Sequence, residues 1–141
     1  MTDFVLDNSI AIRWLLEAPK ISDQKYAEQV LTSLTSSNAL VPNLWHLEAT
    51  NVLLGAEKRS EVNAGEVEAF ISQLENLPIY VDPLTAQQSF NRTLSLARIY
   101  KLSSYDAAYL ELSVREGLPL ATLDKNLLKA AKKAAVDVYL K

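Results

Sequence analysis

The residues Phe4-Val5-Leu6-Asp7-Asn8-Ser9 decide which fold this sequence can adopt. Three apolar residues run directly into an aspartate, and a helical pattern follows at once over about residues 9–17. A short apolar strand that leads straight into a helix is the first half of a βαβ unit. Ligands of open α/β sheets gather beyond the carboxyl ends of the strands, so Asp7 is in a position suited to chemistry. The alternative explanation is that Asp7, Asn8 or Ser9 caps the helix.

The rest of the chain alternates between strand and helix patterns. Short apolar runs predict further strands at residues 39–41, 79–81, 120–123 and 136–139. Helices are predicted from residue 22, over about residues 42–59, 63–76, 85–100 and 104–116, and after residue 124. Gly117 marks the C-terminal end of the helix over residues 104–116. This alternation predicts an α/β fold with a parallel sheet covered on both faces, in a single domain that spans residues 1–141.

Composition excludes several classes of site. The chain has 141 residues, 49% of them hydrophobic and 22% charged, with a net charge of −3. It contains no cysteine, which excludes disulfides and thiolate metal sites. Its one histidine, His46, makes a zinc site improbable and is expected on the outer side of its helix. The apolar runs are too short to cross a bilayer and no signal-peptide pattern is present, so we expect a cytoplasmic protein without a membrane segment.

A second carboxylate falls on a helix position that should face the protein. In the helix over residues 42–59, Glu48 lies four residues from both Leu44 and Val52, on an apolar stripe. A glutamate is rarely buried without a partner. A structural ion pair with an arginine and a functional role explain this position equally well.

Two more acids follow, each with an ordinary explanation. Asp106 shares a helix face with Tyr109, but it also lies in the first turn, where Ser103 or Ser104 can cap and where acids complement the helix dipole. Asp124 directly follows the strand over residues 120–123, as Asp7 follows the first strand, and is a possible N-cap.

The four acids together are less easily explained as separate caps. If they meet in space, they repel one another unless they are protonated or bridged by a cation. An all-oxygen site without His or Cys suits Mg²⁺ or Mn²⁺, and sites of this kind act on phosphate esters. Such a cluster also lowers the formal charge of the chain without repelling an anionic substrate once a metal is bound.

Four segments of the sequence resemble the four motifs of PIN-domain proteins, and they cover the whole chain in the expected order. They are Val5-Leu6-Asp7-Asn8-Ser9, Pro42-x-Leu44-Trp45-x-x-Glu48-x-x-Asn51-x-Leu53, Leu102-Ser103-x-Tyr105-Asp106-Ala107-Ala108-Tyr109-Leu110 and Ala121-Thr122-Leu123-Asp124. Within that superfamily the chain most resembles the VapC-type toxins of bacterial and archaeal toxin–antitoxin systems. One departure is Ala134-Ala135-Val136, where many relatives have a glycine before the last strand.

This resemblance implies a fold, an activity and partners. The fold is a three-layer α/β/α sandwich with a parallel five-stranded sheet of order 3-2-1-4-5 and about seven helices. Active members cleave RNA endonucleolytically with one or two Mg²⁺ or Mn²⁺ ions. Toxin members are inhibited by a small VapB-like antitoxin and commonly form homodimers. Carried over position by position, the resemblance implies that the metal-binding and catalytic acids are Asp7, Glu48, Asp106 and Asp124. It also implies that three further residues support these acids or orient water: Ser9, Asn51 and Thr122.

Basic and apolar residues near the motifs have two interpretations each. The last helix carries four lysines on one face, which is either a solvated amphipathic face or a track for RNA phosphates: Lys125, Lys129, Lys132 and Lys133. Arg13, one turn beyond Ser9, is placed to reach the site or an antitoxin carboxylate. Four apolar and aromatic residues near the start of the chain either contact a partner or belong to the core, and for most of them the core is favoured: Trp14, Leu15, Leu16 and Tyr26. Trp45 and Tyr109 are expected to pack around the site.

Three other functions share part of this pattern. Phosphotransferases of the haloacid-dehalogenase type also place an aspartate after the first strand, but they need a second one where this chain has Ser9. A PIN ribonuclease of RNA maturation or quality control, without an antitoxin, would share every site residue. A binding module with an inactive site is the non-enzymatic alternative, and the presence of all four acids argues against it.

Overall fold

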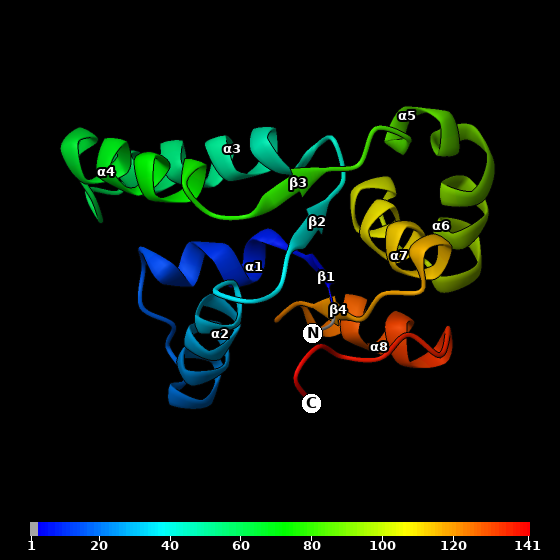
Figure 1. The fold of residues 1–141 in the computed structure, drawn as a ribbon. Coiled ribbons are helices and arrows are strands. Elements are labelled where there is room, and N and C mark those ends of the chain that lie inside the picture. The colour runs from blue at the N-terminus through cyan, green and yellow to red at the C-terminus, as the bar shows by residue number, and fades with distance from the viewer. Residues whose placement is uncertain (1–2) are drawn as a thin grey trace.

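The computed structural model describes residues 3–141 and places the strands between two groups of helices (Figure 1). Strands β1 (Phe4–Leu6), β2 (Ala39–Val41), β3 (Ile79–Val81) and β4 (Leu120–Ala121) form a parallel sheet of order β3-β2-β1-β4. The α/β class and the order of these strands are therefore as predicted. The first two residues of the expected domain lie outside the described part of the chain.

The predicted fifth strand is reduced to a single parallel bridge, in which Leu120 pairs with Val138 on the outer side of β4. Its position agrees with the order 3-2-1-4-5. The ladder stays short because β4 itself has only two residues: Leu120 N donates to Asp137 O, and Tyr139 N donates to Leu120 O. Strand β4 also ends earlier than residue 123, because the backbone N–H of Leu123 binds a side chain instead of a strand.

Each of the seven predicted helices is found within residues 3–141, two of them subdivided. The helical segments are α1 (Asn8–Ala11), η1 (Ile12–Trp14), α2 (Ile21–Ser33), α3 (Trp45–Lys58), α4 (Ala64–Glu75), α5 (Thr85–Gln88), η2 (Ser89–Thr93), α6 (Leu94–Tyr100), α7 (Ser104–Glu116) and α8 (Lys125–Lys133). In this part of the chain no helix combines the length and apolarity needed to cross a membrane.

The first and fifth helices differ from their predicted forms. The helix expected over residues 9–17 turns into the 3₁₀ segment η1 and stops at Trp14, because Leu15 and Leu16 both donate to the carbonyl of Ile12. Beyond it, the Gln24 side chain binds the backbone N–H of Ala18 at 2.7 Å and draws the loop onto α2. The helix over residues 85–100 is continuous but contains the π-helical turn η2.

Local signals account for the other helix ends. Asn63 and Glu66 form a capping box at the start of α4. Gly117 ends α7 with a φ of 65°, the left-handed conformation that glycine adopts without strain. The predicted role of Gly117 is confirmed. The capping box of α4 was not predicted, although it also depends only on neighbours in sequence.

The core lies between the sheet and its helices. All three residues of β1 are fully buried, as expected for a central parallel strand covered on both faces. Tyr26 is buried in this core, and Trp14 packs against it while donating its indole N–H to Ala27 O at 2.8 Å. Leu15 and Leu16 pack on a second cluster around Phe70, within the hairpin of α3 and α4. The core interpretation of these residues is confirmed.

Candidate functional site

Asp7 lies directly after β1 and is held by two hydroxyl groups. Both Ser9 Oγ and Thr122 Oγ1 donate to Asp7 Oδ2, each at 2.7 Å, and the residue is only 8% exposed. No side chain caps α1, so the expectation that Asp7, Asn8 or Ser9 caps this helix is wrong. The reason is that the carboxylate and the Ser9 hydroxyl bind each other instead of the first helical turn.

A chain of hydrogen bonds joins the ends of β1 and β4. Ser9 Oγ accepts from the backbone N–H of Leu123 at 2.9 Å, and Thr122 Oγ1 accepts from that of Asp124 at 3.0 Å. Asp124 Oδ1 caps α8 by accepting from Leu127 N at 2.9 Å. The cap explanation for Asp124 is therefore correct. Among residues 3–141, the other oxygen of Asp124, Oδ2, accepts no hydrogen bond.

Glu48 has a tyrosine partner and not an arginine. Tyr109 Oη donates to Glu48 Oε1 at 2.5 Å, which joins α3 to α7. Asn8 Nδ2 donates to Trp45 O at 2.9 Å and approaches Tyr109 Oη at 3.5 Å, so α1 joins the same group. Within residues 3–141 Glu48 forms no ion pair, and the structural ion-pair explanation fails.

Sequence reasoning assigned Tyr109 to packing and gave Asn8 no role in the site. The packing is confirmed, since Tyr109 and Trp45 are both buried. The tyrosine hydroxyl was missed, although Tyr109 lies three residues from Asp106 on the same helix face. Asn8 had no such signal, because its two partners lie 37 and 101 positions away along the chain.

Asp106 lies in the first turn of α7, where Ser103 Oγ caps the helix by accepting from Asp106 N at 3.1 Å. Its half-buried carboxylate accepts no hydrogen bond from the described residues. The position thus complements the helix dipole, as the ordinary explanation requires. It also lies near enough to Asp7 and Asp124 for their charges to raise its pKa.

Burial and mutual repulsion raise the pKa values of three of the four acids. Burial is the largest cause of the raised pKa of Asp7, Glu48 and Asp106. The charge of Asp124 raises the pKa of Asp7, and the charges of Asp124 and Asp7 raise the pKa of Asp106. Asp7 and Asp106 likewise raise the pKa of Glu48. The four acids therefore lie close enough to repel one another, and no Lys or Arg of residues 3–141 neutralises them.

The donor set fits a hard divalent cation in its chemistry. It consists of carboxylate oxygens with the hydroxyls of Ser9 and Thr122 beside them, and several of the carboxylate oxygens accept no hydrogen bond from residues 3–141. The spacing is wider than a coordination sphere, because within residues 3–141 no three such side chains are close enough to hold an ion. Binding a metal therefore requires these side chains to move together, which their mutual repulsion opposes in its absence.

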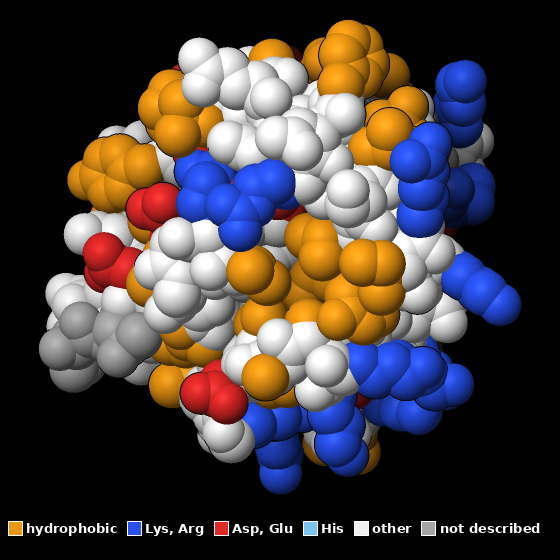
Figure 2. Space-filling view, turned by 90° about the vertical axis from the view of Figure 1, so that its right-hand side faces the viewer, with side chains coloured by type: hydrophobic (Ala, Val, Ile, Leu, Met, Phe, Trp, Pro, Cys, Tyr) orange, Lys and Arg blue, Asp and Glu red, His pale blue; other side chains and the backbone are white. Residues whose placement is uncertain are grey.

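The remaining predicted site residues lie further out. Asn51 is exposed and makes no hydrogen bond to the acids in the described chain. Lys125 and Lys129 lie on the exposed face of α8. Figure 2 shows Lys and Arg side chains gathered along the lower part of the face that carries α6, α7 and α8. Arg13 lines a hollow together with Ser9 and Asp124. His46 is exposed, as predicted.

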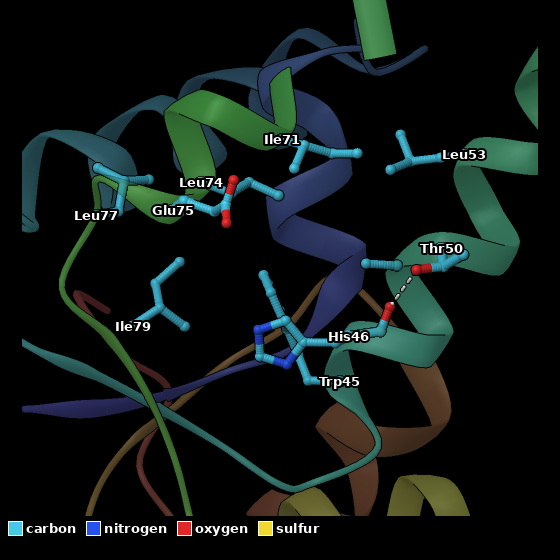
Figure 3. Close-up of a pocket in the computed structure, with 10 residues that line it drawn as sticks. Trp45, His46, Thr50, Leu53, Ile71, Leu74, Glu75, Leu77 and Ile79 are labelled. Carbon is cyan, nitrogen blue, oxygen red and sulfur yellow. Dashed lines mark hydrogen bonds between the residues drawn. The ribbon is translucent and has the colours of Figure 1, made fainter. Parts of the chain in front are cut away.

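A larger hollow, of about 360 Å³, lies between α3, α4 and β3 (Figure 3). Its walls are mainly apolar and include Leu53, Ile71 and Leu74, while His46 and Glu75 stand at its polar side. None of the four acids lines it. This hollow is therefore a separate surface feature from the carboxylate site.

Comparison with known proteins agrees with this geometry. The model of the PIN domain family matches residues 4–133, and the chain therefore belongs to the PIN domain family. Among solved structures, PAE2754 from Pyrobaculum aerophilum is similar with a TM-score of 0.65 and 20% identity, over 92% of this chain and 86% of that one. FitAcB from Neisseria gonorrhoeae is similar with a TM-score of 0.58 and 18% identity, over 96% of each chain. No curated protein matches the sequence.

PIN domains are generally nucleases, and they typically use divalent metals. Family membership thus agrees with the carboxylate-rich site that the fold assembles. At identities of 18% and 20%, the similarity to the two solved structures supports the fold alone.

Proposed function

We propose that this chain is a Mg²⁺- or Mn²⁺-dependent endoribonuclease, the toxin of a VapBC-like toxin–antitoxin pair in the cytoplasm, with its activity in one PIN domain. The observation that supports the proposal is that four carboxylates from four separate segments lie close enough to repel one another, with no Lys or Arg of residues 3–141 paired to them. Unpaired carboxylates this close are unfavourable without a cation. When bound, a divalent metal polarises a phosphoryl oxygen and lowers the pKa of a water molecule.

The contacts of each acid indicate its role in the proposed reaction. Asp7 and Asp106 hold the principal metal, with Ser9 and Thr122 keeping the Asp7 carboxylate in one orientation. Glu48, oriented by Tyr109, is a further ligand or aligns the attacking water. Asp124 acts through water or at a second, weaker metal position.

RNA is bound by cations around the acidic centre. Arg13 lines the hollow beside Ser9 and Asp124, and is the nearest candidate for a backbone phosphate. Lys125 and Lys129 follow Asp124 on α8 and extend the positive surface outward. Asn51 orients water, since its exposed side chain lies on α3 one helical turn after Glu48.

A small antitoxin is the proposed inhibitor, and a second copy of the chain the proposed partner in a homodimer. The apolar hollow in Figure 3 suits the apolar face of a short helical segment. Exposed apolar side chains on η2, α6 and α7 support a homodimer, among them Phe90 at 94% exposure, Leu94 and Val114. A small reading frame that overlaps the start of this gene and encodes a binding partner would separate a toxin from an RNA-maturation enzyme.

The test is a cleavage-site map on total RNA with the wild type and with Asp106→Asn. We expect discrete cuts by the wild type in Mg²⁺ or Mn²⁺, loss of these cuts in EDTA, and no cuts by the variant. Asp137→Asn, at an exposed position outside the site, should cleave like the wild type. Cleavage that survives in EDTA, or in Asp7→Asn, would overturn the proposal.

A further inference from the structure

A small hollow adjoins the acidic centre on the side of α2. It measures about 260 Å³ and is lined by Ser9 and Asp124 from the centre itself, by Arg13 and Asp23 as its other charged groups, and by Pro19 and Leu123 as apolar walls. Its size is slightly below the range of about 300–1,000 Å³ usual for small-molecule sites. The hollow is therefore suited to one nucleoside and not to a larger ligand.

The two charged groups away from the centre have no charged partners among residues 3–141. Arg13 donates one long hydrogen bond, from Nη1 to Glu17 O at 3.4 Å, and forms no ion pair. The partly buried carboxylate of Asp23 takes part in no hydrogen bond or ion pair in this part of the chain. Although both line the same hollow, they do not pair with each other. A ligand with an anionic group and a set of hydrogen-bond donors would satisfy both.

The wall that carries these groups is held in place before any ligand binds. Gln24, next to Asp23, accepts from Ala18 N at 2.7 Å and donates to Arg13 O at 3.1 Å. One amide thus ties the loop before α2 to the end of η1. On the opposite wall, Leu123 N is bound by Ser9 Oγ at 2.9 Å. A preformed hollow lowers the entropic cost of binding.

We propose that this hollow binds the guanine nucleoside of single-stranded RNA that is next to the cleaved phosphate, with Asp23 accepting from the guanine base and Arg13 contacting a backbone phosphate. The inference rests on the proposed ribonuclease function for the position of the cleaved phosphate. The shared residues Ser9 and Asp124 place the hollow directly beside that position.

The choice of guanine follows from hydrogen-bonding chemistry. An ionised carboxylate only accepts hydrogen bonds, and it has two oxygens in one plane. Guanine presents two adjacent donors on its Watson–Crick edge, N1–H and the 2-amino group, and a carboxylate accepts from both. Adenine, cytosine and uracil each present one donor beside an acceptor that the carboxylate repels. Unstacked bases of single-stranded RNA are read on this edge.

The first test measures binding without catalysis. The full chain is titrated with the four 5′-ribonucleoside monophosphates and with inosine 5′-monophosphate, in Mg²⁺ and again in EDTA, following backbone amide shifts of the hollow by NMR. We expect guanosine monophosphate to bind about tenfold or more tighter than the other three, with inosine monophosphate weakened because it lacks the 2-amino group. Asp23→Asn should abolish this preference, and Arg13→Gln should weaken all four ligands alike. Asp137→Asn is the matched control and should change neither.

The second test maps cleavage sites in total RNA. A guanosine should adjoin the cuts made by the wild type, and Asp23→Asn should cut with that preference lost. RNA cleavage by the wild type with no guanosine preference at the cuts, or equal binding of the four monophosphates, would overturn the inference and leave the ribonuclease proposal standing. Binding of guanosine monophosphate that depends on Asp23, without any RNA cleavage, would support the hollow and contradict the ribonuclease. If Asp23→Asn changes affinity only for a protein partner, the hollow is a protein contact and the inference is wrong.

Discussion

Asp7 is a buried carboxylate that receives two hydroxyl hydrogen bonds and no positive charge from residues 3–141. Hydrogen bonds to a charged group are favourable, and they hold the carboxylate in one orientation. They do not remove the repulsion from Asp124 or from the other acids. This combination of fixed orientation and uncompensated charge is what a cation-binding group requires.

Tyr109→Phe tests whether the orientation of Glu48 matters. The substitution removes the hydroxyl that donates to Glu48 Oε1 and keeps the buried ring. We expect RNA cleavage to fall roughly 10–100-fold, as for other groups that orient metal ligands, while the free energy of unfolding falls by only about 1 kcal/mol. Single-turnover cleavage and urea unfolding measure the two effects.

The matched control for this prediction is Tyr80→Phe, at an exposed position on β3. It should change neither cleavage nor stability. If Tyr109→Phe cleaves RNA as fast as the wild type, the Tyr109 hydroxyl has no part in orienting Glu48.

Asp106→Asn tests the repulsion among the acids through its pH dependence. The folded-state pKa of Asp106 is raised above its unfolded value, so the folded protein binds protons first as the pH falls. The wild type in EDTA should therefore become more stable as the pH is lowered from about 7 toward about 5. Asp106→Asn should be more stable than the wild type at neutral pH and should respond less to pH.

Asp137→Asn should instead follow the wild-type curve, and chemical unfolding in EDTA at several pH values measures all three proteins. The comparison between variants is needed because other carboxylates also titrate in this range. If Asp106→Asn is less stable than the wild type at neutral pH, the carboxylate is stabilised in the fold and the repulsion argument is wrong.

At the scale of elements, α7 connects the site to the far side of the sheet. Its first turns carry Asp106 and Tyr109, and its last turns carry Glu111 and Arg115. The guanidinium of Arg115 binds Glu111 at 2.9 and 3.0 Å and Asp82, just after β3, at 2.6 and 3.2 Å. These contacts raise the pKa of Arg115. The helix is thereby held at both ends relative to the strands.

Arg115→Met should destabilise the fold strongly, because it leaves the buried carboxylates of Asp82 and Glu111 without a cation. Breaking a buried ion pair from one side costs about 3–5 kcal/mol. Urea unfolding in Mg²⁺-free buffer measures the change. Glu61→Gln, which breaks the exposed pair with Arg59, should cost less than about 1 kcal/mol. Equal losses of unfolding free energy in the two variants would show that the buried ion pairs of Arg115 stabilise the fold no more than the exposed pair does.

Elements were predicted best where their signals are local. The strands of the sheet and the serine cap of α7 were predicted correctly, because their signals are carried by residues adjacent in sequence. The cap of α4 is equally local, although it was not predicted. The early end of the first helix was missed, because Leu15 and Leu16 both donate to Ile12 O and the Gln24 side chain, eleven positions away, binds Arg13 O. The fifth strand was predicted too long, because β4 ends at Ala121 and Leu123 N donates to Ser9 Oγ, 114 positions away, and not to a strand.

At the scale of the whole molecule, the parallel topology brings distant residues together. The hydrogen bond from Thr122 to Asp7 joins positions 115 apart, and that from Tyr109 to Glu48 joins positions 61 apart. Parallel strands have their carboxyl ends at one edge of the sheet, so residues that follow β1 and β4 meet there. The helices α3 and α7 then add Glu48 and Asp106.

Mg²⁺ or Mn²⁺ should stabilise the whole fold by mass action. A metal that binds only the folded state at about 100 times its dissociation constant adds about 2.7 kcal/mol. Thermal unfolding with increasing Mg²⁺ should therefore show a rising Tm for the wild type. Asp7→Asn should show a much smaller rise, and Asp137→Asn the full one. A wild-type Tm that is indifferent to both metals would contradict a site built from these acids.

The sequence by itself determined the α/β class and the order of elements, because hydrophobic periodicity and helix signals are properties of neighbouring residues. The assignment of the four acids to a site rests on motif spacing and stays a prediction. Only the tertiary structure decided how each acid is held: Asp7 by two hydroxyls, Glu48 by a tyrosine, Asp124 as a cap, and Asp106 without a partner. Whether a carboxylate is paired, oriented or repelled depends on groups that folding brings within a few ångströms of it, and these lie up to 115 positions away along the chain.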